Sequence, residues 1–149
     1  MTFEEFKAFV GRHAHLFGGA PREVEGSIEQ AEARLGFRLP ETLRWLLREH
    51  GYAEAAGVDS LAMSVEATLR CRRALSLPNK YIVLNDWGDV GVVVMDASGD
   101  DPESWPVYWS GSHNVNRLAE GEPLDNDCDA YPGYVAWALS RIESSLENT

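Results

Sequence analysis

Residues 28–51 read IEQAEARLGFRLPETLRWLLREHG, and this stretch decides the fold. Apolar residues recur at helical spacing at Ile28, Ala31 and Leu35, which predicts an amphipathic helix. Gly36 follows the last of them and is placed to end the helix with a residue in the left-handed conformation.

A second helix is expected directly after the first. Pro40 suits its first turn, because the N–H that proline lacks would be unpaired there anyway. Leu43, Leu46 and Leu47 would form its buried stripe, and Gly51 is a good stop. The stretch therefore predicts two consecutive amphipathic helices joined by a short apolar connection.

Capping signals place further helix ends. Thr2 and Glu5 have capping-box spacing at the start of an amphipathic N-terminal segment, and Ser27 has the same spacing with a glutamine three residues later. In the middle of the chain, 61–63 is expected to be a short strand, and Ser64 is expected to cap a short helix after it.

The second half of the chain changes from helical to strand character. Three apolar runs at 81–84, 92–95 and 106–109, with short connections, predict an antiparallel meander. The runs are apolar on both faces, so the sheet is expected to be covered on both sides or to carry aromatic side chains into an interface. After Gly111 the chain reads as irregular until a final helix at 134–146.

Together these patterns predict one α+β domain over residues 1–149, with an antiparallel sheet of about four to six strands flanked by helices. No apolar run approaches a membrane span, and the N-terminus does not have the pattern of a secretory signal, so we expect a cytoplasmic protein. The two cysteines, Cys71 and Cys128, are far apart and are interpreted as reduced thiols.

The formal net charge of −11 is concentrated in the second half of the chain. Residues 1–75 hold 10 basic and 11 acidic residues, whereas residues 76–149 hold 3 basic and 13 acidic ones. Phosphate binding needs the opposite sign, which excludes nucleic acid as a direct partner and disfavours anionic membranes. A basic protein is the partner that this charge favours, and the alternative is that the acidity only keeps the chain soluble.

Residues 28–51 resemble the signature of the SUKH superfamily and its Smi/Knr-like family. That signature is an amphipathic helix ending in Leu-Gly, then an apolar residue, Leu-Pro, and a second helix closed by a glycine. The later sheet, its Asp/Gly turn and a closing helix with Trp137 are also similar to the family, so the resemblance spans most of the chain. Family members usually have Asn before the closing glycine, where this chain has His50.

The resemblance implies a binding role. Bacterial members of the superfamily are commonly immunity proteins that bind and neutralise a toxin, often a nuclease, and eukaryotic members act in cell-wall synthesis and signalling. Neither group is known for catalysis, which implies a protein that is not an enzyme and needs no cofactor. We expect a toxin-neutralising immunity protein that binds a basic toxin stoichiometrically. The alternative is an intracellular scaffold or regulatory binding module of the same fold, and the oligomeric state stays open.

The candidate partner-binding patch joins acidic residues to aromatic ones, because aromatic anchors ringed by charge make good hot spots. Its members are Asp86, Trp87, Asp89, Asp100, Asp101, Glu103, Trp105, Asp125, Asp127 and Asp129. Tryptophans are more often core residues, and this interpretation is adopted for Trp45 and Trp137. Trp87 is expected to be exposed, since it lies between aspartates in a turn.

Other chemistry finds little support in the sequence. Residues 125–129 read DNDCD, with the alternate acidic spacing of a calcium loop, but Ala130 and Ala136 stand where an EF-hand needs glycine and glutamate. We therefore expect no metal site. No nucleophile-elbow, phosphate-loop or zinc-protease motif is present, and a metal-assisted or carboxylate-based hydrolase is kept only as a further alternative.

Overall fold

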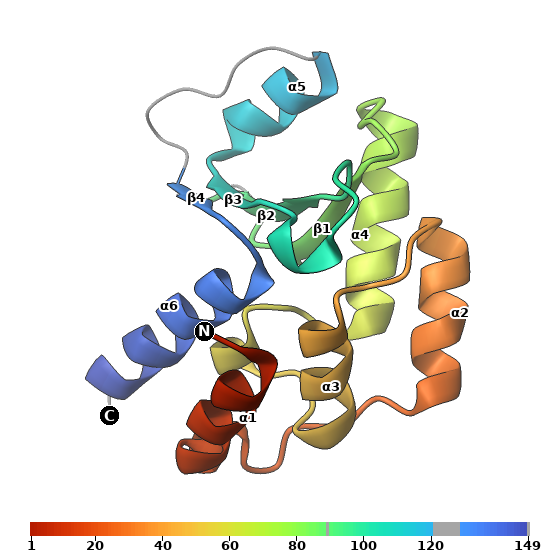
Figure 1. Ribbon diagram of the computed structural model, residues 1–149. Coiled ribbons are helices and arrows are strands. Elements are labelled where there is room, and N and C mark those ends of the chain that lie inside the picture. The colour runs from red at the N-terminus through yellow and green to blue at the C-terminus, as the bar shows by residue number, and fades with distance from the viewer. Residues whose placement is uncertain (89, 121–128, 149) are drawn as a thin grey trace.

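The computed structural model describes residues 1–88, 90–120 and 129–148 (Figure 1). Its sheet has four antiparallel strands that are neighbours in chain order. They are β1 (Tyr81–Asp86), β2 (Val92–Asp96), β3 (Val107–Ser110) and β4 (Asp129–Tyr131). The predicted α+β class and the antiparallel meander are therefore confirmed.

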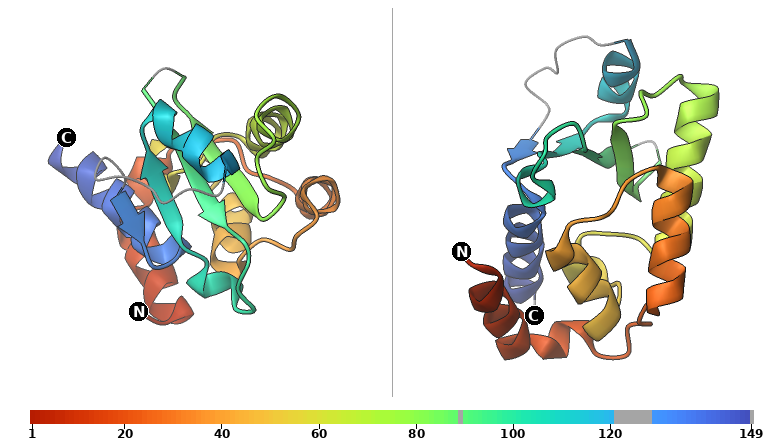
Figure 2. Two further views of the ribbon diagram at one scale, coloured as in Figure 1. Left: turned by 90° about the horizontal axis from the view of Figure 1, so that it is seen from above. Right: turned by 45° about the vertical axis from the view of Figure 1, so that its right-hand side comes forward.

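Six helices and three short 3₁₀ turns complete the described part of the chain. The helices are α1 (Phe3–Arg12), α2 (Glu25–Leu35), α3 (Glu41–Glu49), α4 (Leu61–Ala74), α5 (Ser112–Glu120) and α6 (Tyr134–Glu147), and the 3₁₀ turns are η1 (Ala14–Phe17), η2 (Glu54–Ala56) and η3 (Pro102–Ser104). Helix α5 lies over one face of the sheet, whereas α1, α3 and α6 lie on the other side (Figures 1 and 2). In the described residues, no helix combines the length and the apolar character needed to cross a bilayer.

Both faces of the sheet are covered, as one of the two sequence-based interpretations predicts. Ile82 and Val93 belong to the larger core, which also contains residues of α1, α2, α3 and α6. Their strand neighbours Val83 and Val94 point to the opposite face and join a smaller core with Leu118 of α5. This two-sided burial explains why the strands read as continuous apolar runs rather than as an alternation of apolar and polar residues.

Helix α4 satisfies the free edge of β1 with its own hydroxyl groups. The Ser64 hydroxyl donates to the carbonyl of Val83, and the Val83 N–H donates to Thr68 Oγ1 at 2.9 Å. Ser60 caps the helix, accepting a hydrogen bond at 3.2 Å from the N–H three residues on. The predicted strand at 61–63 and the predicted Ser64 cap are therefore wrong: the short apolar run is the first turn of α4, and periodicity cannot assign so short a run.

Other helix ends agree with the sequence in part. The capping box of Thr2 and Glu5 is present, with both hydrogen bonds at 3.1 Å, and Gly36 ends α2 in the left-handed conformation at φ 91°. Helix α2 begins at Glu25 rather than near Ser27. Helix α5 was not predicted, because the segment after β3 has too few apolar residues to show a period.

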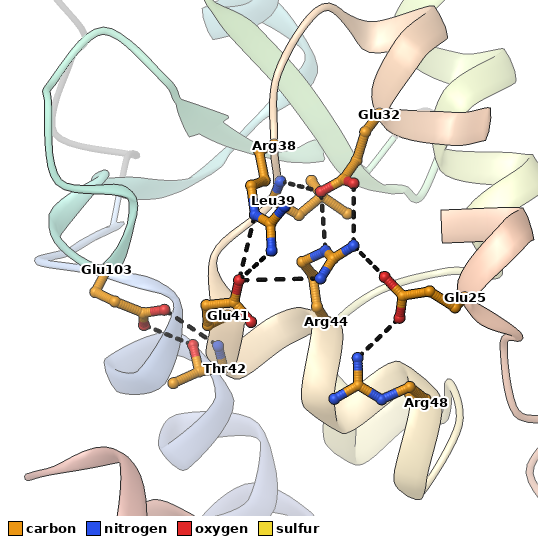
Figure 3. Close-up of polar contacts among 9 residues, drawn as sticks. All are labelled: Glu25, Glu32, Arg38, Leu39, Glu41, Thr42, Arg44, Arg48 and Glu103. Carbon is orange, nitrogen blue, oxygen red and sulfur yellow. Dashed lines mark hydrogen bonds and ion pairs between the residues drawn. The ribbon is translucent and has the colours of Figure 1, made fainter. Parts of the chain in front are cut away.

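A buried arginine joins α2 to α3 (Figure 3). The Arg44 side chain is 4 % exposed and pairs with Glu25 and with Glu32, whose Oε2 lies 3.1 Å from Arg44 Nε. Glu32 also accepts the Leu39 N–H at 2.6 Å. Burial lowers the pKa of Arg44, but the Glu32 and Glu25 carboxylates outweigh it, and the net shift is upward. The Leu-Pro connection between the two helices is thus held by charge as well as by packing.

A second junction ties the helical part to the sheet through the segment after η2. The Gly57 carbonyl accepts hydrogen bonds from Trp137 Nε1 of α6 and from Asn85 Nδ2 of β1, each at 2.8 Å. The Tyr134 hydroxyl donates to the Ala56 carbonyl at 2.7 Å. Gly57 has φ 72°, and a Cβ atom added to it would lie 2.3 Å from Trp137 Nε1. Only glycine fits there without displacing α6.

Replacing Arg44 tests the first junction. Arg44→Met leaves the Glu32 carboxylate, 11 % exposed, without its cation, so we expect the free energy of unfolding to fall by about 3 kcal/mol or more. Arg38→Met is the control, because the Arg38–Glu41 pair is exposed and its loss should cost less than about 0.5 kcal/mol. Urea unfolding measures both, and equal losses would show that the buried pair is unimportant.

Replacing Gly57 tests the second junction. Gly57→Ala adds backbone strain at positive φ and a clash with Trp137, so we expect a loss of about 3 kcal/mol. Gly19→Ala is the matched control, because Gly19 has φ 78° with open space around it, and should lose only about 1 kcal/mol. Thermal unfolding of the two variants separates clash from strain, and similar midpoints would contradict the contact with Trp137.

Candidate functional site

The described members of the predicted patch divide between the two ends of the sheet. We call the end with the β1–β2 connection the turn end and the end with the β2–β3 connection the loop end. The turn end has Asp86, Trp87 and Asp129, and the loop end has Asp100, Asp101, Glu103 and Trp105. Successive connections of a meander leave from opposite ends, and a five-residue strand such as β2 separates them by roughly 14 Å. The residues Asp89, Asp125 and Asp127 lie outside the described part of the chain.

Most loop-end side chains have roles within the fold. Trp105 is 5 % exposed and packs against Phe37, so its predicted role as a surface anchor is corrected: the connection folds it into the core. Glu103 accepts hydrogen bonds from the Thr42 N–H at 3.1 Å and from Thr42 Oγ1 at 2.6 Å, which caps the start of α3 (Figure 3). Asp101 caps η3, accepting the Glu103 N–H at 3.1 Å. Asp100 is exposed.

The turn end has a different character. The Asp86 carboxylate forms an ion pair with Arg70 of α4. Trp87 is half-buried: its ring lies 6.1 Å from the ring of Trp109, and the Arg141 guanidinium carbon lies 5.7 Å from its centre. Trp87 is therefore only partly exposed, because Trp109 and Arg141 pack against it. Trp137 is fully buried and Trp45 is half-buried against the same core, in line with the core interpretation.

Two adjoining hollows open beside Asp86 and Trp87. The larger, of about 430 Å³, lies between the η2 region, the start of α4, the end of β1 and α6. The smaller, of about 210 Å³, lies between α4 and β1, and the two share Asp59 and Met63. We call them together the turn-end groove, and its principal residues are Glu54, Asp59, Met63, Glu66, Arg70, Asp86, Trp87 and Arg141.

Asp59 lies where the two hollows meet. Its N–H donates to the Leu84 carbonyl at 3.0 Å, and its carboxylate accepts the Asp86 N–H at 3.2 Å, so it pairs with the edge of β1 like one residue of an added strand. Burial raises the pKa of Asp59; the hydrogen bond from Asp86 lowers it and the Asp86 charge raises it again, for a net upward shift. Asp59 is thus a carboxylate whose negative charge is poorly compensated.

Sequence reasoning missed six of these eight residues. Two of them, Glu54 and Arg141, line the larger hollow, and the other four are Asp59, Met63, Glu66 and Arg70. These four lie in the first half of the chain, where acidic and basic residues balance and no charge excess marks them. Only the packing of α4 along β1 brings them beside Asp86. The Met-x-x-Glu spacing of Met63 and Glu66, which places both on one helix face, was a signal in the sequence that could have indicated them.

The residue types that line the groove are those of a contact surface. In the parts of the chain that the structure describes, His, Cys, Asp and Glu form no group of three that could hold a metal ion. The groove combines an exposed methionine and a half-buried tryptophan, residue types that are enriched at contact surfaces between proteins, with carboxylates around them.

The charge of Asp59 is expected to destabilise the fold at neutral pH. An acid whose folded pKa is raised favours the folded state below its unfolded pKa of about 3.9 and loses that contribution as the pH rises through the folded pKa. The stability of Asp59→Asn relative to wild type should therefore increase between acid and neutral pH, measured as urea midpoints. Glu29→Gln, at an exposed position of α2, should show no such trend. A relative stability of Asp59→Asn that falls with pH would contradict the unfavourable charge.

Comparison with known proteins assigns the chain to a family. The pattern of the SMI1 / KNR4 family (SUKH-1) matches residues 25–130, from α2 to β4, and so includes the α2–α3 pair, α4 and the sheet. No curated protein and no solved structure gives a significant match. Because the match covers well over half of the chain, and because the helix–Leu-Pro–helix pair and the antiparallel sheet are in place, the chain belongs to the SMI1 / KNR4 family (SUKH-1).

Proposed function

We propose that this chain is a toxin-neutralising immunity protein that binds a basic toxin, in the first instance a nuclease, through the turn end of its sheet. Membership of the SMI1 / KNR4 family (SUKH-1) supports a role of the immunity or Smi/Knr-like class. The observation that carries the finer proposal is the turn-end groove, where apolar side chains are accessible among carboxylates.

The apolar part of the groove supports a protein partner. Met63 is 59 % exposed on the first turn of α4, although a large apolar side chain is usually buried. Trp87 lines the same hollow. Methionine adapts its shape to a partner surface, and tryptophan is among the residues that contribute most to binding energy.

The charge of the chain supports a basic partner. The formal net charge is −11, and a nuclease needs a basic face to attract phosphate. An acidic protein that meets this face would cover it, and complementary charge can raise association rates to about 10⁸–10⁹ M⁻¹s⁻¹ at low salt. Rapid capture is what an inhibitor of a toxic enzyme requires.

Co-expression with basic nuclease toxins of the same organism tests the function. We expect at least one toxin to become harmless in the presence of the chain and to co-purify with it in equimolar amounts. If no toxin is neutralised, and the chain instead co-purifies with cell-wall or signalling proteins, the immunity proposal fails and the regulatory role expected for other members of the fold replaces it.

The kinetics of that complex test the binding face. The association rate should fall steeply with added salt, because exposed charges are screened over about 10 Å at 0.1 M. Glu66→Lys, at the groove, should slow association by about tenfold or more, whereas Glu29→Lys changes the net charge equally on α2 and should slow it less. Equal slowing by both variants would show that only net charge matters and would remove the turn end as the binding face.

A further inference from the structure

We infer that the turn-end groove receives one arginine or lysine side chain of the partner, with an apolar residue next to it, and that the cation lies against Asp59 and Glu66. The inference rests on the proposed function, because it names what the partner presents to the same surface. It follows from the balance of charges in the groove and from the position of Met63.

The groove differs in its charge from the hollow at the loop end. That hollow, of about 400 Å³, lies between α1, α3 and η3 and is also partly apolar. Its carboxylates help to hold the fold: Glu103 accepts two hydrogen bonds from Thr42, Asp101 accepts the Glu103 N–H and so caps η3, and Glu41 pairs with Arg38 at 2.7 Å. A cation entering the loop-end hollow would compete with contacts that cap α3 and η3.

The turn-end groove contains more carboxylates than basic side chains. Its two arginines are already engaged, Arg70 with Asp86 and Arg141 with Glu54 at 3.2 Å. Among the described residues this leaves Asp59 and Glu66 with no basic partner. A cation of the partner would supply the positive charge that these two carboxylates lack.

Asp59 gains most from such a cation. Its carboxylate lies in a partly buried position next to Asp86, and both burial and that neighbouring charge disfavour ionisation and raise its pKa. The other charged groups of the groove are Glu66 and Arg70 on α4, Glu54 on η2, and Arg141 on α6. In the free protein, burial and the neighbouring charge of Asp86 make the ionised Asp59 carboxylate unfavourable. A positive group close to Asp59 would stabilise the ionised carboxylate, and this stabilisation would contribute to the binding energy.

The apolar surface matches the stem of a long basic side chain. Met63 lines both hollows, and Trp87 lies across the larger one. Lysine and arginine place their methylene groups along apolar surfaces while the charged end reaches a carboxylate. Within the chain, Arg141 shows that Trp87 packs beside a basic side chain: its guanidinium carbon lies 5.7 Å from the Trp87 ring, and the same side chain pairs with Glu54. A basic side chain of the partner would place its stem against Met63 and its charged end at Asp59 and Glu66.

Two short peptides test this inference on the full chain without any toxin. The probes are acetyl-Leu-Arg-Leu-amide and its neutral counterpart acetyl-Leu-Gln-Leu-amide, followed by NMR of the Met63 methyl group and the Trp87 indole N–H. The arginine peptide should shift both signals and bind about fivefold more tightly than the glutamine peptide at low salt, with the preference shrinking as salt is added. Equal binding of both peptides, or shifts confined to residues of the loop end, would overturn the inference.

Variants separate the charge from the apolar contact. Asp59→Asn should reduce the preference for arginine, the double change of Asp59→Asn with Glu66→Gln should abolish it, and Met63→Ala should weaken both peptides alike. Glu29→Gln removes one negative charge from α2 and should leave the preference unchanged. The far-ultraviolet circular dichroism and unfolding midpoint of each variant check its fold. An undiminished preference in Asp59→Asn would overturn the role of Asp59.

The peptide experiment and the toxin experiment fail independently. If the arginine peptide is preferred but no toxin is neutralised, the groove binds as inferred and the immunity function is wrong. If a toxin is neutralised with equal affinity by wild type, Asp59→Asn and Met63→Ala, the function stands and the groove is not where the partner's cation lies.

Discussion

Residues 56–59 form hydrogen bonds with helix α6 and with strand β1, and these bonds fix the position of the helices relative to the sheet. The Gly57 carbonyl holds Trp137 of α6 and Asn85 of β1, and Asp59 pairs with the β1 edge through its N–H and its carboxylate. One short segment therefore fixes the helices, the sheet and the central carboxylate of the groove relative to one another. The fold and the proposed site share the same hydrogen bonds, so a change in this segment affects both.

The same packing determines which mode of binding is open to β1. Ser64 and Thr68 occupy the backbone groups of Val83, and Asp59 occupies those of Leu84 and Asp86. An added strand would have to displace α4 to pair there. The edge of β1 thus presents side chains rather than free backbone groups, and under the proposed function its acidic groove would select a basic surface. This is consistent with the charge of the chain as a whole.

Most helices and strands of the fold could be predicted from the sequence, but the ion pairs that join them could not. The stretch 28–51 predicts its helix pair because apolar periodicity and Gly36 are local signals, and the apolar runs predict the strands for the same reason. The start of α4 was misread, since three apolar residues carry no period. The buried pairing of Arg44 with Glu32 depends on two helices coming together, and no spacing in the sequence indicates it.

The candidate site shows the same division between local and long-range information. Asp86 and Trp87 could be chosen because they stand together in a turn, and they do lie at the groove. Grouping them with Asp101 and Glu103 ignored the alternation of hairpin ends, which separates the two sets along the strands. Asp59 and Met63 come from a region without charge excess, and only the three-dimensional packing of α4 on β1 identifies them.

Hydrogen exchange of the backbone amides in a neutralised toxin complex is the most direct measurement of which face binds. If the turn end is covered, the amides around Met63 on α4 and around Trp87 should exchange more slowly in the complex than in the free chain, while those around Asp100 stay unchanged. Slower exchange around Asp100, with the groove unaffected, would place the partner at the other end of the sheet and contradict the account.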